Sequence, residues 1–337
     1  MFGYCNSVIM RLTRNYVPEL PVVVCSRQIR INLKEQTVMQ RMKASDFPQE
    51  VLNLFDRYVH GGIDRRTFID RASKYAAGGM TATAMFEALK PNFALGEVIP
   101  SNDTRIKAQD VPYPSPQGNT KTSGYLVVPA NAKGKLPTIL VVHENRGLNP
   151  HIRDIARRLA VSGYLAFAPD ALAPLGGYPG DEEKAVAAFG TLDGNKRTED
   201  FVAASNWIKG HAQSTGKLGS VGFCFGGGVV NTLAVRLGDG LAAGVPFYGA
   251  QPPAADVAKI KAHMLIQYAG MDERIDAGWP AYEAALKANK VHYEQYTYEG
   301  AQHGFNNDTT PRYDKKSADM AWQRTMAWFD KFVKATS

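Results

Sequence analysis

The sequence predicts an α/β fold in which a mostly parallel central sheet is covered by helices on both faces. Beyond Pro100, short β-rich runs alternate with helical stretches, which is the pattern of such a fold. Two of the runs, residues 138–142 and 221–223, are almost continuously apolar, as expected of central strands buried on both faces. The chain has 337 residues, enough for one domain of about 200–250 residues with an appendage.

The elements of this domain follow in a regular order along the chain. We expect strands at residues 122–128, 136–143, 164–169, 218–223, 243–247, 264–268 and 293–298. The spacing of apolar residues predicts helices at residues 152–161, 198–209, 227–236, 282–288 and 318–334. Residues 100–337 are therefore expected to form one α/β domain.

The first hundred residues differ from the rest. Residues 1–41 lack clean periodicity and predict a poorly structured arm, and a translation start at Met42, downstream of that arm, stays open. Residues 42–99 predict a helical extension. Its two helices are expected at residues 47–58 and 64–89, the second with an interruption near Gly78-Gly79.

Arg65-Arg66 begins a stretch that has the order of a twin-arginine export signal. The pair precedes Phe68-Ile69 and then a weakly apolar run. Charged residues interrupt the apolar part, so we expect an amphipathic helix that packs on the main domain. The expected location is the cytoplasm, with export through this segment as the alternative.

Composition and charge exclude several classes of protein. The formal net charge of +7 comes from 39 basic and 32 acidic residues that are dispersed, so we expect no nucleic-acid partner. No apolar run reaches the ~18–20 residues of a membrane span, so we expect no integral membrane segment. The oligomeric state stays open.

Cysteine and histidine spacing predicts no metal and no cofactor. The three cysteines, Cys5, Cys25 and Cys224, form no CxxC pair, which indicates neither a disulfide framework nor a zinc ribbon. His143, Glu144 and His151 are of metal-binding type and lie close together in the sequence, but their spacing matches no regular ligand motif.

The segment Gly222-Phe223-Cys224-Phe225-Gly226 lies between an apolar strand and a helix. It has the glycine–x–nucleophile–x–glycine form of a sharp strand-to-helix turn that exposes its middle side chain. The unpaired amides at the start of the helix favour a thiolate at Cys224, and the amide of Phe225 is expected to hold an oxyanion. Two other interpretations stay open: a small buried cysteine before a packing helix, and a phosphate-binding loop.

An acid and a histidine follow where such a nucleophile requires them. Asp272 comes soon after the expected strand 264–268, and His303 lies in a glycine-containing loop after 293–298. Taken alone, Asp272 is typical of a turn and His303 of a protein surface. Because nucleophile, acid and histidine follow in this order in chains with such a turn, the three predict a catalytic triad.

The loop after the expected strand 136–143 holds two further candidates. This loop commonly supplies the second oxyanion donor, so we expect the amide of Asn145 in that role. Glu144 is then expected close to the thiol. The alternative for Glu144 is a structural ion pair with Arg146 or Arg153.

Together these residues resemble the dienelactone hydrolase family, the carboxymethylenebutenolidase-like proteins, over about residues 100–335. The shared pattern is Gly-x-Cys-x-Gly-Gly, a later Asp, a later loop with His, and an early Glu after a strand. The resemblance implies an α/β-hydrolase fold and triad roles for Cys224, Asp272 and His303. It also implies that Glu144 holds the resting thiol until substrate displaces it, and that residues 45–95 are an extension found in a bacterial subgroup.

One departure from the family concerns the substrate. Members that cleave dienelactone carry one arginine four residues beyond the catalytic histidine and another upstream of the nucleophile, which hold the substrate carboxylate. Here the first position is Asn307, and the second has no clear counterpart. Arg146 and Arg312 are the candidates to replace these arginines, so dienelactone itself stays open as the substrate.

The sequence therefore predicts a hydrolase of esters or lactones that acts through a thioester on Cys224. A thioesterase or another small-acyl hydrolase on the same fold is one alternative, because specificity depends on pocket shape. A non-catalytic ligand-binding or interaction protein on a hydrolase scaffold is another, with the helical extension as its docking surface.

Overall fold

The computed structural model describes residues 41–76 and 79–334. Within these residues, eight strands form one sheet in the order β1-β2-β4-β3-β5-β6-β7-β8. β2 pairs antiparallel with β1 and β4, and all other neighbours are parallel. The strands are Ile106–Pro112 (β1), Ser123–Pro129 (β2), Leu136–Val142 (β3), Leu165–Pro169 (β4), Ser214–Phe223 (β5), Ala243–Phe247 (β6), His263–Ala269 (β7) and Tyr293–Tyr298 (β8).

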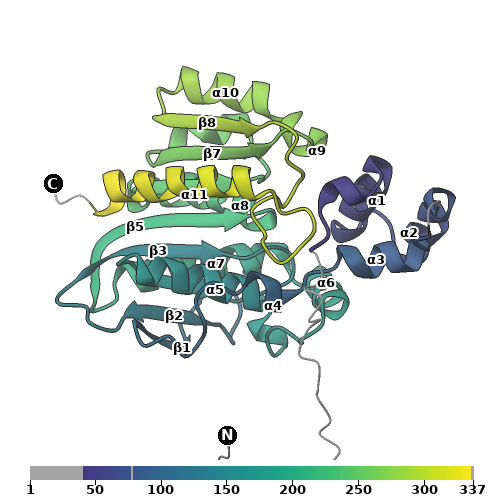
Figure 1. Cartoon of the computed structure of the whole chain (residues 1–337). Helices are drawn as coiled ribbons and strands as arrows, with labels where there is room; N and C mark the ends of the chain where they lie inside the picture. Colours follow the sequence, from purple (N-terminus) through teal and green to yellow (C-terminus); the bar gives the residue numbers. More distant parts are fainter. Residues whose placement is uncertain (1–40, 77–78, 335–337) are drawn as a thin grey trace, which may run out of the picture. The chain divides into compact units, whose positions relative to one another are not determined.

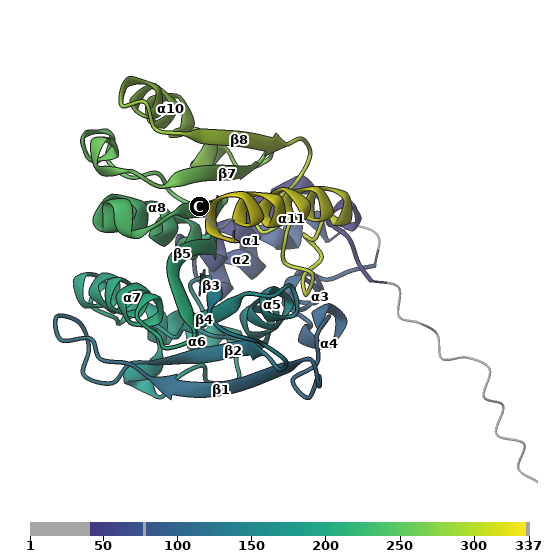
Figure 2. The same ribbon diagram turned by 90° about the vertical axis from the view of Figure 1, so that its left-hand side faces the viewer.

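Helices cover both faces of this sheet and bury an apolar cluster against each (Figures 1 and 2). One face carries α5 (Pro150–Val161) and α11 (Lys315–Phe329). The other face carries α6 (Glu182–Gly190), α7 (Gly194–Lys209), α8 (Phe225–Leu237) and α10 (Trp279–Ala288). Because both faces are covered, the apolar run of β3 is buried without alternation, as in other parallel sheets. This architecture confirms the expected α/β fold.

Short elements complete the described chain. α4 (Phe93–Gly96) precedes the sheet, and α9 (Glu273–Asp276) follows β7. Single 3₁₀ turns and one π turn occupy Ala44–Asp46, Ser73–Tyr75, Ala173–Leu175, Gly238–Gly240, Ala254–Lys259 and Asp330–Lys334.

The sequence analysis missed four elements, β1, α4, α6 and α9, and misplaced several boundaries, such as the starts of β5 (214 instead of 218) and α7 (194 instead of 198). β1 is not among the expected strands, because this edge strand exposes most of its residues and has no apolar alternation. α6 is also absent from the expected helices, since only Ala185 and Phe189 of this short helix are buried. α8 begins at Phe225 instead of residue 227, because the helix continues through three glycines that are unfavourable for a helix by propensity.

Three helices precede the sheet domain and share an apolar cluster of their own: α1 (Gln49–Val59), α2 (Arg65–Ala72) and α3 (Ala82–Leu89). At its centre the ring centroids of Phe55, Phe68 and Phe86 lie 5.2–6.1 Å apart. The expectation that the helix after Arg65-Arg66 packs on the main domain was wrong, because its buried residues belong to this separate cluster.

The helical segment and the sheet belong to one compact unit. The N-terminal arm expected over residues 1–41 lies outside the described residues apart from Arg41, as do Cys5 and Cys25. The division into arm, extension and α/β domain stays a prediction. None of the described helices is both long and apolar enough to span a membrane.

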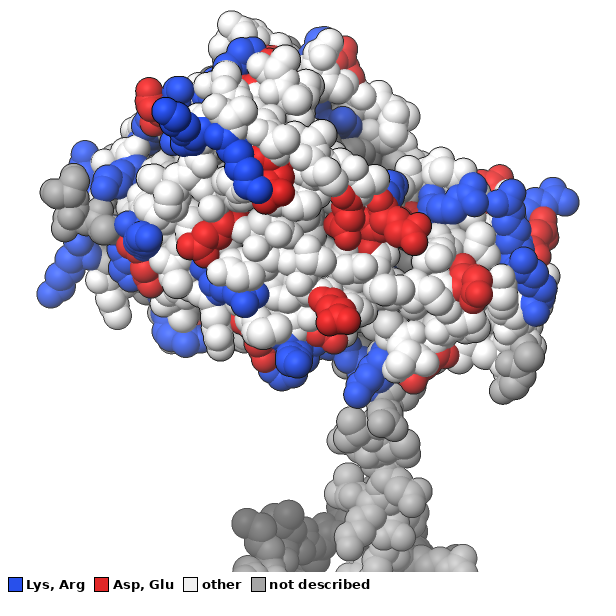
Figure 3. Space-filling model, turned by 90° about the horizontal axis from the view of Figure 1, so that it is seen from above, with Lys and Arg blue, Asp and Glu red and all other residues white. Residues whose placement is uncertain are grey.

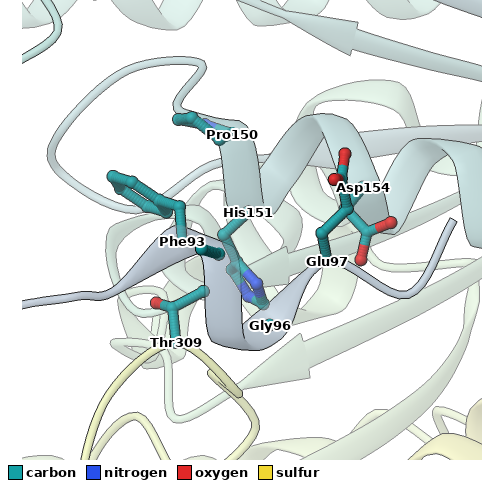
Figure 4. A pocket seen from close by; sticks show the side chains of 8 residues that line it. Phe93, Gly96, Glu97, Pro150, His151, Asp154 and Thr309 are labelled. Atoms are coloured by element: carbon teal, nitrogen blue, oxygen red, sulfur yellow. The ribbon is translucent and has the colours of Figure 1, made fainter. Parts of the chain in front are cut away.

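Asp154 connects the segment after the three helices to α5. It is 1% exposed, and its carboxylate accepts hydrogen bonds from the backbone N–H groups of Val98 (3.1 Å) and Ile99 (2.8 Å). It also pairs with Arg158 at 2.5 Å and with Arg157 at 3.5 Å. Figure 4 shows Asp154 one helical turn beyond His151, beside a small pocket of about 160 Å³ between α4 and α5.

Replacing Asp154 with alanine is expected to lower the free energy of unfolding by about 3–5 kcal/mol. The change leaves the amides of Val98 and Ile99 without their acceptor and removes the buried carboxylate that Arg157 and Arg158 share, although these arginines keep Glu97 and Asp308 as partners. Lys315→Ala is the control, because Lys315 is 75% exposed and solvent screens its pair with Asp319. Urea unfolding followed by circular dichroism measures both, and equal midpoints would contradict the prediction.

Basic and acidic side chains are interspersed on the face shown in Figure 3. Blue residues adjoin one another at the right-hand edge of this view, with red residues beside them, and elsewhere both colours are scattered among white ones. The expectation that nucleic acid is not a partner stays a prediction.

Candidate active site

Cys224 occupies a sharp corner between β5 and α8. β5 ends at Phe223 and α8 begins at Phe225, so Cys224 is the N-cap residue, with φ 56° and ψ −115°. A non-glycine residue with positive φ is uncommon and strained, and such strain concentrates at functional sites. The corner is held by hydrogen bonds from the Cys224 N–H to the Phe247 carbonyl (3.1 Å) and from the Gly228 N–H to the Cys224 carbonyl (3.2 Å).

The glycines around Cys224 are required by close backbone contacts. A Cβ atom at Gly222 would lie 2.2 Å from the Gly226 carbonyl oxygen. A Cβ atom at Gly226 would lie 2.3 Å from the Val142 carbonyl oxygen, at the end of β3. The glycine pattern therefore allows the first turn of α8 to pack directly on the central strands and places Cys224 at their carboxyl ends.

His303 and Asp272 meet at the same edge of the sheet, in the loops after β8 and β7. The Nδ1 of His303 lies 2.5 Å from Oδ2 of Asp272, and both residues are buried. We assign the Nδ1–H tautomer from this acceptor, which leaves Nε2 for the thiol. The structure therefore brings His303 and Asp272 into contact and places a ring nitrogen of His303 within 4.8 Å of the sulfur of Cys224.

A third group, which the sequence analysis missed, contacts the sulfur. His60 is the residue after α1, and its Nε2 lies 3.2 Å from Sγ of Cys224. One ligand-type atom from each of His60, Cys224 and His303 lies within 4.8 Å of the others. Among the described residues this group has the composition to hold a metal, although its members are far apart in sequence and show no spacing motif.

The electrostatics of the site favour a thiolate beside imidazolium. Burial opposes the charged thiol, but His303 and His60 offset it and lower the pKa of Cys224 to about 5. Burial lowers the pKa of His303, but Cys224 and Asp272 raise it to about 10. Cys224 is thus expected to be ionised at neutral pH, the form in which cysteine is a nucleophile.

The two expected oxyanion donors lie near the nucleophile. Phe225 is the first residue of α8, and N–H groups in the first turn of a helix have no partner within the helix. Asn145 lines the same pocket as Cys224 and Phe225. Its side chain is used elsewhere, because Nδ2 donates to the Val59 carbonyl at 2.6 Å. The oxyanion role of both amides stays a prediction.

Glu144 is buried beside this site but has a different partner from the one expected. Its Oε2 accepts a hydrogen bond from Nδ2 of Asn307 at 3.2 Å, while His60 is the partner of the sulfur. The ion-pair alternative also fails for Arg146 and Arg153, which pair with Glu182 (2.7 Å) and Asp110 (2.9 Å). A role for Glu144 in holding the resting thiol stays a prediction.

The expected substrate contacts lie outside the pocket beside the thiol. That pocket has a volume of about 320 Å³ and is lined by Cys224, Phe225, Val229, Tyr248, Gln251 and Arg274, among others. Arg146 and Asn307 are occupied by the contacts above. Arg312 lines a separate pocket of about 380 Å³, in which its Nη1 lies 3.7 Å from Asp56.

Arg274 and Tyr248 are further site residues that the sequence analysis missed. Arg274 follows Asp272 by two residues, so a location near the site could have been predicted once Asp272 had been proposed as the acid. Tyr248 directly follows β6 with φ 38°, and its ring lies 4.9 Å from that of His303. The strand itself was expected, but an apolar strand end does not indicate which following side chain faces the site.

His143 and His151, the histidines whose spacing was examined for a metal site, make structural contacts. His143 is fully buried, and its Nε2 accepts a hydrogen bond from the Ala171 N–H at 3.0 Å. Its Nδ1 faces the Glu144 carbonyl at 2.5 Å. His151 lies on α5, with its Nδ1 3.2 Å from Asp308. Both rings are therefore held by contacts away from Cys224.

This combination of sheet and site defines a class of protein. A nucleophile at a glycine-flanked corner after a central parallel strand, followed along the chain by an acid and a histidine after later strands, is the arrangement of the α/β-hydrolase fold. The sheet order and both helical layers agree with it.

The chain belongs to the dienelactone hydrolase family, whose model matches residues 122–333. A relative named "Putative carboxymethylenebutenolidase" from Saccharolobus solfataricus is 32% identical over 253 residues, covering 64% of this chain and 95% of the relative. A crystal structure titled as a putative dienelactone hydrolase from Klebsiella pneumoniae is 30% identical, with a TM-score of 0.60, covering 67% of this chain and 99% of that one. The protein is therefore a carboxylic ester hydrolase of the dienelactone hydrolase type.

The helical segment is matched separately. Residues 39–77 match a family model described as YqhI-like, outside the range of the hydrolase model. His60 and Asp56 thus belong to a segment that the hydrolase family model does not include.

Another relative is the "Putative hydrolase fragment YghX" of Escherichia coli K12, which is 54% identical over 105 residues, covering 31% of this chain and 90% of that protein.

Proposed function

We propose that the protein hydrolyses a small carboxylic ester or lactone through a Cys224–His303–Asp272 triad and a thioester intermediate. The observation that carries this proposal is the buried thiol at the strand-to-helix corner, beside an imidazole whose Nδ1 is 2.5 Å from a carboxylate. In such an arrangement the carboxylate orients the imidazole and stabilises its protonated form.

The reaction has two halves. The sulfur gives its proton to an imidazole and attacks the carbonyl carbon; a C–S bond forms, and the carbonyl π electrons move to oxygen. The amides of Phe225 and Asn145 are the proposed donors to that oxyanion. Its collapse breaks the C–O bond, and the imidazolium gives its proton to the leaving alkoxide, which is released as the alcohol. Water then loses a proton to an imidazole as it attacks the thioester, the C–S bond breaks, the acid leaves, and that proton returns to the sulfur and its imidazole partner.

The pocket supports a small substrate. Its volume of about 320 Å³ is at the lower end of ligand pockets, which span about 300–1,000 Å³. Its lining combines apolar residues with His60, His303 and Arg274, and of these three only the guanidinium of Arg274 keeps its positive charge at every step. We therefore propose Arg274, in place of Arg146 or Arg312, as the group that would meet a substrate carboxylate.

The test is to trap the intermediate. Enzyme mixed with p-nitrophenyl acetate, quenched in acid and digested, should carry one acetyl group on the peptide that contains Cys224, as shown by mass spectrometry. Parallel reactions with a lactone and an acetyl thioester determine which acyl class turns over fastest. Full turnover with acetyl on no cysteine, or on Cys5 or Cys25 alone, would overturn the proposal.

A further inference from the structure

His60 brings a second imidazole to the nucleophile from outside the sheet domain. Besides the 3.2 Å contact between Nε2 and the sulfur, its ring meets that of His303 edge-on, with centroids 4.8 Å apart. Its Nδ1 lies 2.7 Å from the backbone oxygen of Asp56 and 3.3 Å from Oδ1 of the same residue. Both imidazoles thus have a fixed acceptor for Nδ1–H, which leaves Nε2 for proton exchange with Cys224.

We propose that His60 is a second catalytic base and acid of this enzyme, which takes the proton of Cys224 and passes it to the leaving group, while His303 activates water. The proposal rests on the ester-hydrolase function proposed above and assigns a catalytic contribution to the helical segment.

The proton transfers balance over one cycle. In acylation the proton of Cys224, held on Nε2 of His60 in the resting thiolate–imidazolium pair, moves to the leaving alkoxide as the C–O bond breaks. In deacylation His303 takes a proton from water as its oxygen attacks the thioester. The C–S bond then breaks, and His303 returns that proton to the sulfur. Two imidazoles therefore divide the work that one imidazole must otherwise do twice.

His60 is held in place by the loops that carry the rest of the site. Asn145, after β3, donates to the carbonyl of Val59, the residue before His60. Arg274, after β7, and Arg312, after β8, each place a guanidinium nitrogen 3.7 Å from a carboxylate oxygen of Asp56. The end of α1 therefore contacts the loop after β3, the short helix α9 and the loop after β8. These three contacts fix the position of His60 relative to Cys224.

The surroundings of His60 favour its protonated form. It follows the last turn of α1, where the free carbonyls of a helix end stabilise a cation. Burial lowers the pKa of His60, but Cys224 and Asp56 raise it to about 9. The other ionisable or charged groups that face this cluster come from five separate loops or helices: Asp56, Glu144, Tyr248, Asp272, Arg274, Asp276, His303 and Arg312.

A proton is a better occupant of this cluster than a metal ion. Nη2 of Arg274 lies 3.1 Å from Nε2 of His60, so a metal ion bound to that nitrogen would face the positive charge of the guanidinium. The same guanidinium can donate to neutral imidazole and withdraw when the ring is protonated, because the Arg274 side chain is 47% exposed.

The test compares four enzymes: wild type, His60→Gln, His303→Gln and the double variant. Glutamine keeps most of the volume and the polar contacts but accepts no proton. Stopped-flow release of p-nitrophenol gives the acylation rate, and the pH dependence of iodoacetamide inactivation gives the thiol pKa. Arg57→Ala is the control, because this exposed residue lies on the same helix without a described side-chain partner.

We expect His60→Gln to acylate roughly tenfold to a hundredfold more slowly than wild type. His303→Gln should still acylate but accumulate the thioester, because deacylation has lost its base. Each single variant should keep a thiol pKa below the ordinary value of about 8.5, and only the double variant should return to it. Arg57→Ala should match wild type in both measurements.

Several outcomes would overturn the role of His60 while leaving the ester-hydrolase function intact. These are an unchanged or faster acylation in His60→Gln, and a return of the thiol pKa to about 8.5 in His303→Gln alone. Loss of wild-type activity in EDTA with recovery on adding Zn²⁺ would assign the cluster to a metal instead. Failure of wild type to form any acyl-Cys224 would instead overturn the proposed function itself.

Discussion

Replacing Cys224 with alanine is expected to lower kcat/KM for activated esters and lactones by roughly a thousandfold or more, as is normal when a triad loses its nucleophile. The reason is local. Alanine keeps the corner between β5 and α8 but leaves both imidazoles without a sulfur to deprotonate. The residual rate would come from the oxyanion donors acting on water, which are retained.

The activity assay needs a control variant that loses a cysteine other than the proposed nucleophile. Cys25→Ala serves, because it removes a thiol that the proposed mechanism does not use. Both variants are assayed with p-nitrophenyl acetate at one pH after circular dichroism has established their folding. If Cys224→Ala turned over as fast as Cys25→Ala, no mechanism based on a cysteine nucleophile could be kept.

Replacing Gly226 with alanine is expected to lower the free energy of unfolding by about 3 kcal/mol or more. The added Cβ would lie 2.3 Å from the carbonyl oxygen of Val142 and 2.7 Å from that of His143. Both contacts are to backbone, so the helix must move away from β3. Activity should fall with stability, because the same turn of α8 positions Cys224.

Gly228→Ala is the matched control two residues further along the same helix. Its Cβ would meet nothing nearer than 3.6 Å, and alanine is favoured over glycine in a helix by up to about 1 kcal/mol. Thermal unfolding should therefore separate the two variants by several degrees, with Gly226→Ala below wild type. Equal melting temperatures would mean that the contact with β3 is not as close as described.

Local rules were sufficient to predict much of this site. The glycines on either side of Cys224 are a specific signal for a sharp strand-to-helix turn. Asp272 and His303 each come soon after an expected strand. The carboxyl ends of parallel strands meet at one edge of the sheet, so sequence order alone predicted that these side chains meet. Glu144 was proposed from the family resemblance in addition to its position, and its partner, Asn307, was not predicted.

His60 could not be found in the same way. It lies 164 residues before Cys224, in a helical segment whose orientation on the sheet no periodicity specifies. Its only local signal is Asp56 four residues earlier, a spacing that is common on helix surfaces. Side chains supplied across such a distance depend on tertiary contacts such as that between Asn145 and Val59, which sequence patterns do not encode.

The apolar cluster of α1, α2 and α3 is separate from the two clusters that cover the sheet. Polar contacts join the helices to the sheet domain, among them Lys90 with Glu183 and Gln49 with Gln302. Such attachments resist local opening less than a buried apolar interface does. We therefore expect the three helices to open as a unit under mild denaturation, before the sheet does, leaving Cys224 and His303 in place but without His60.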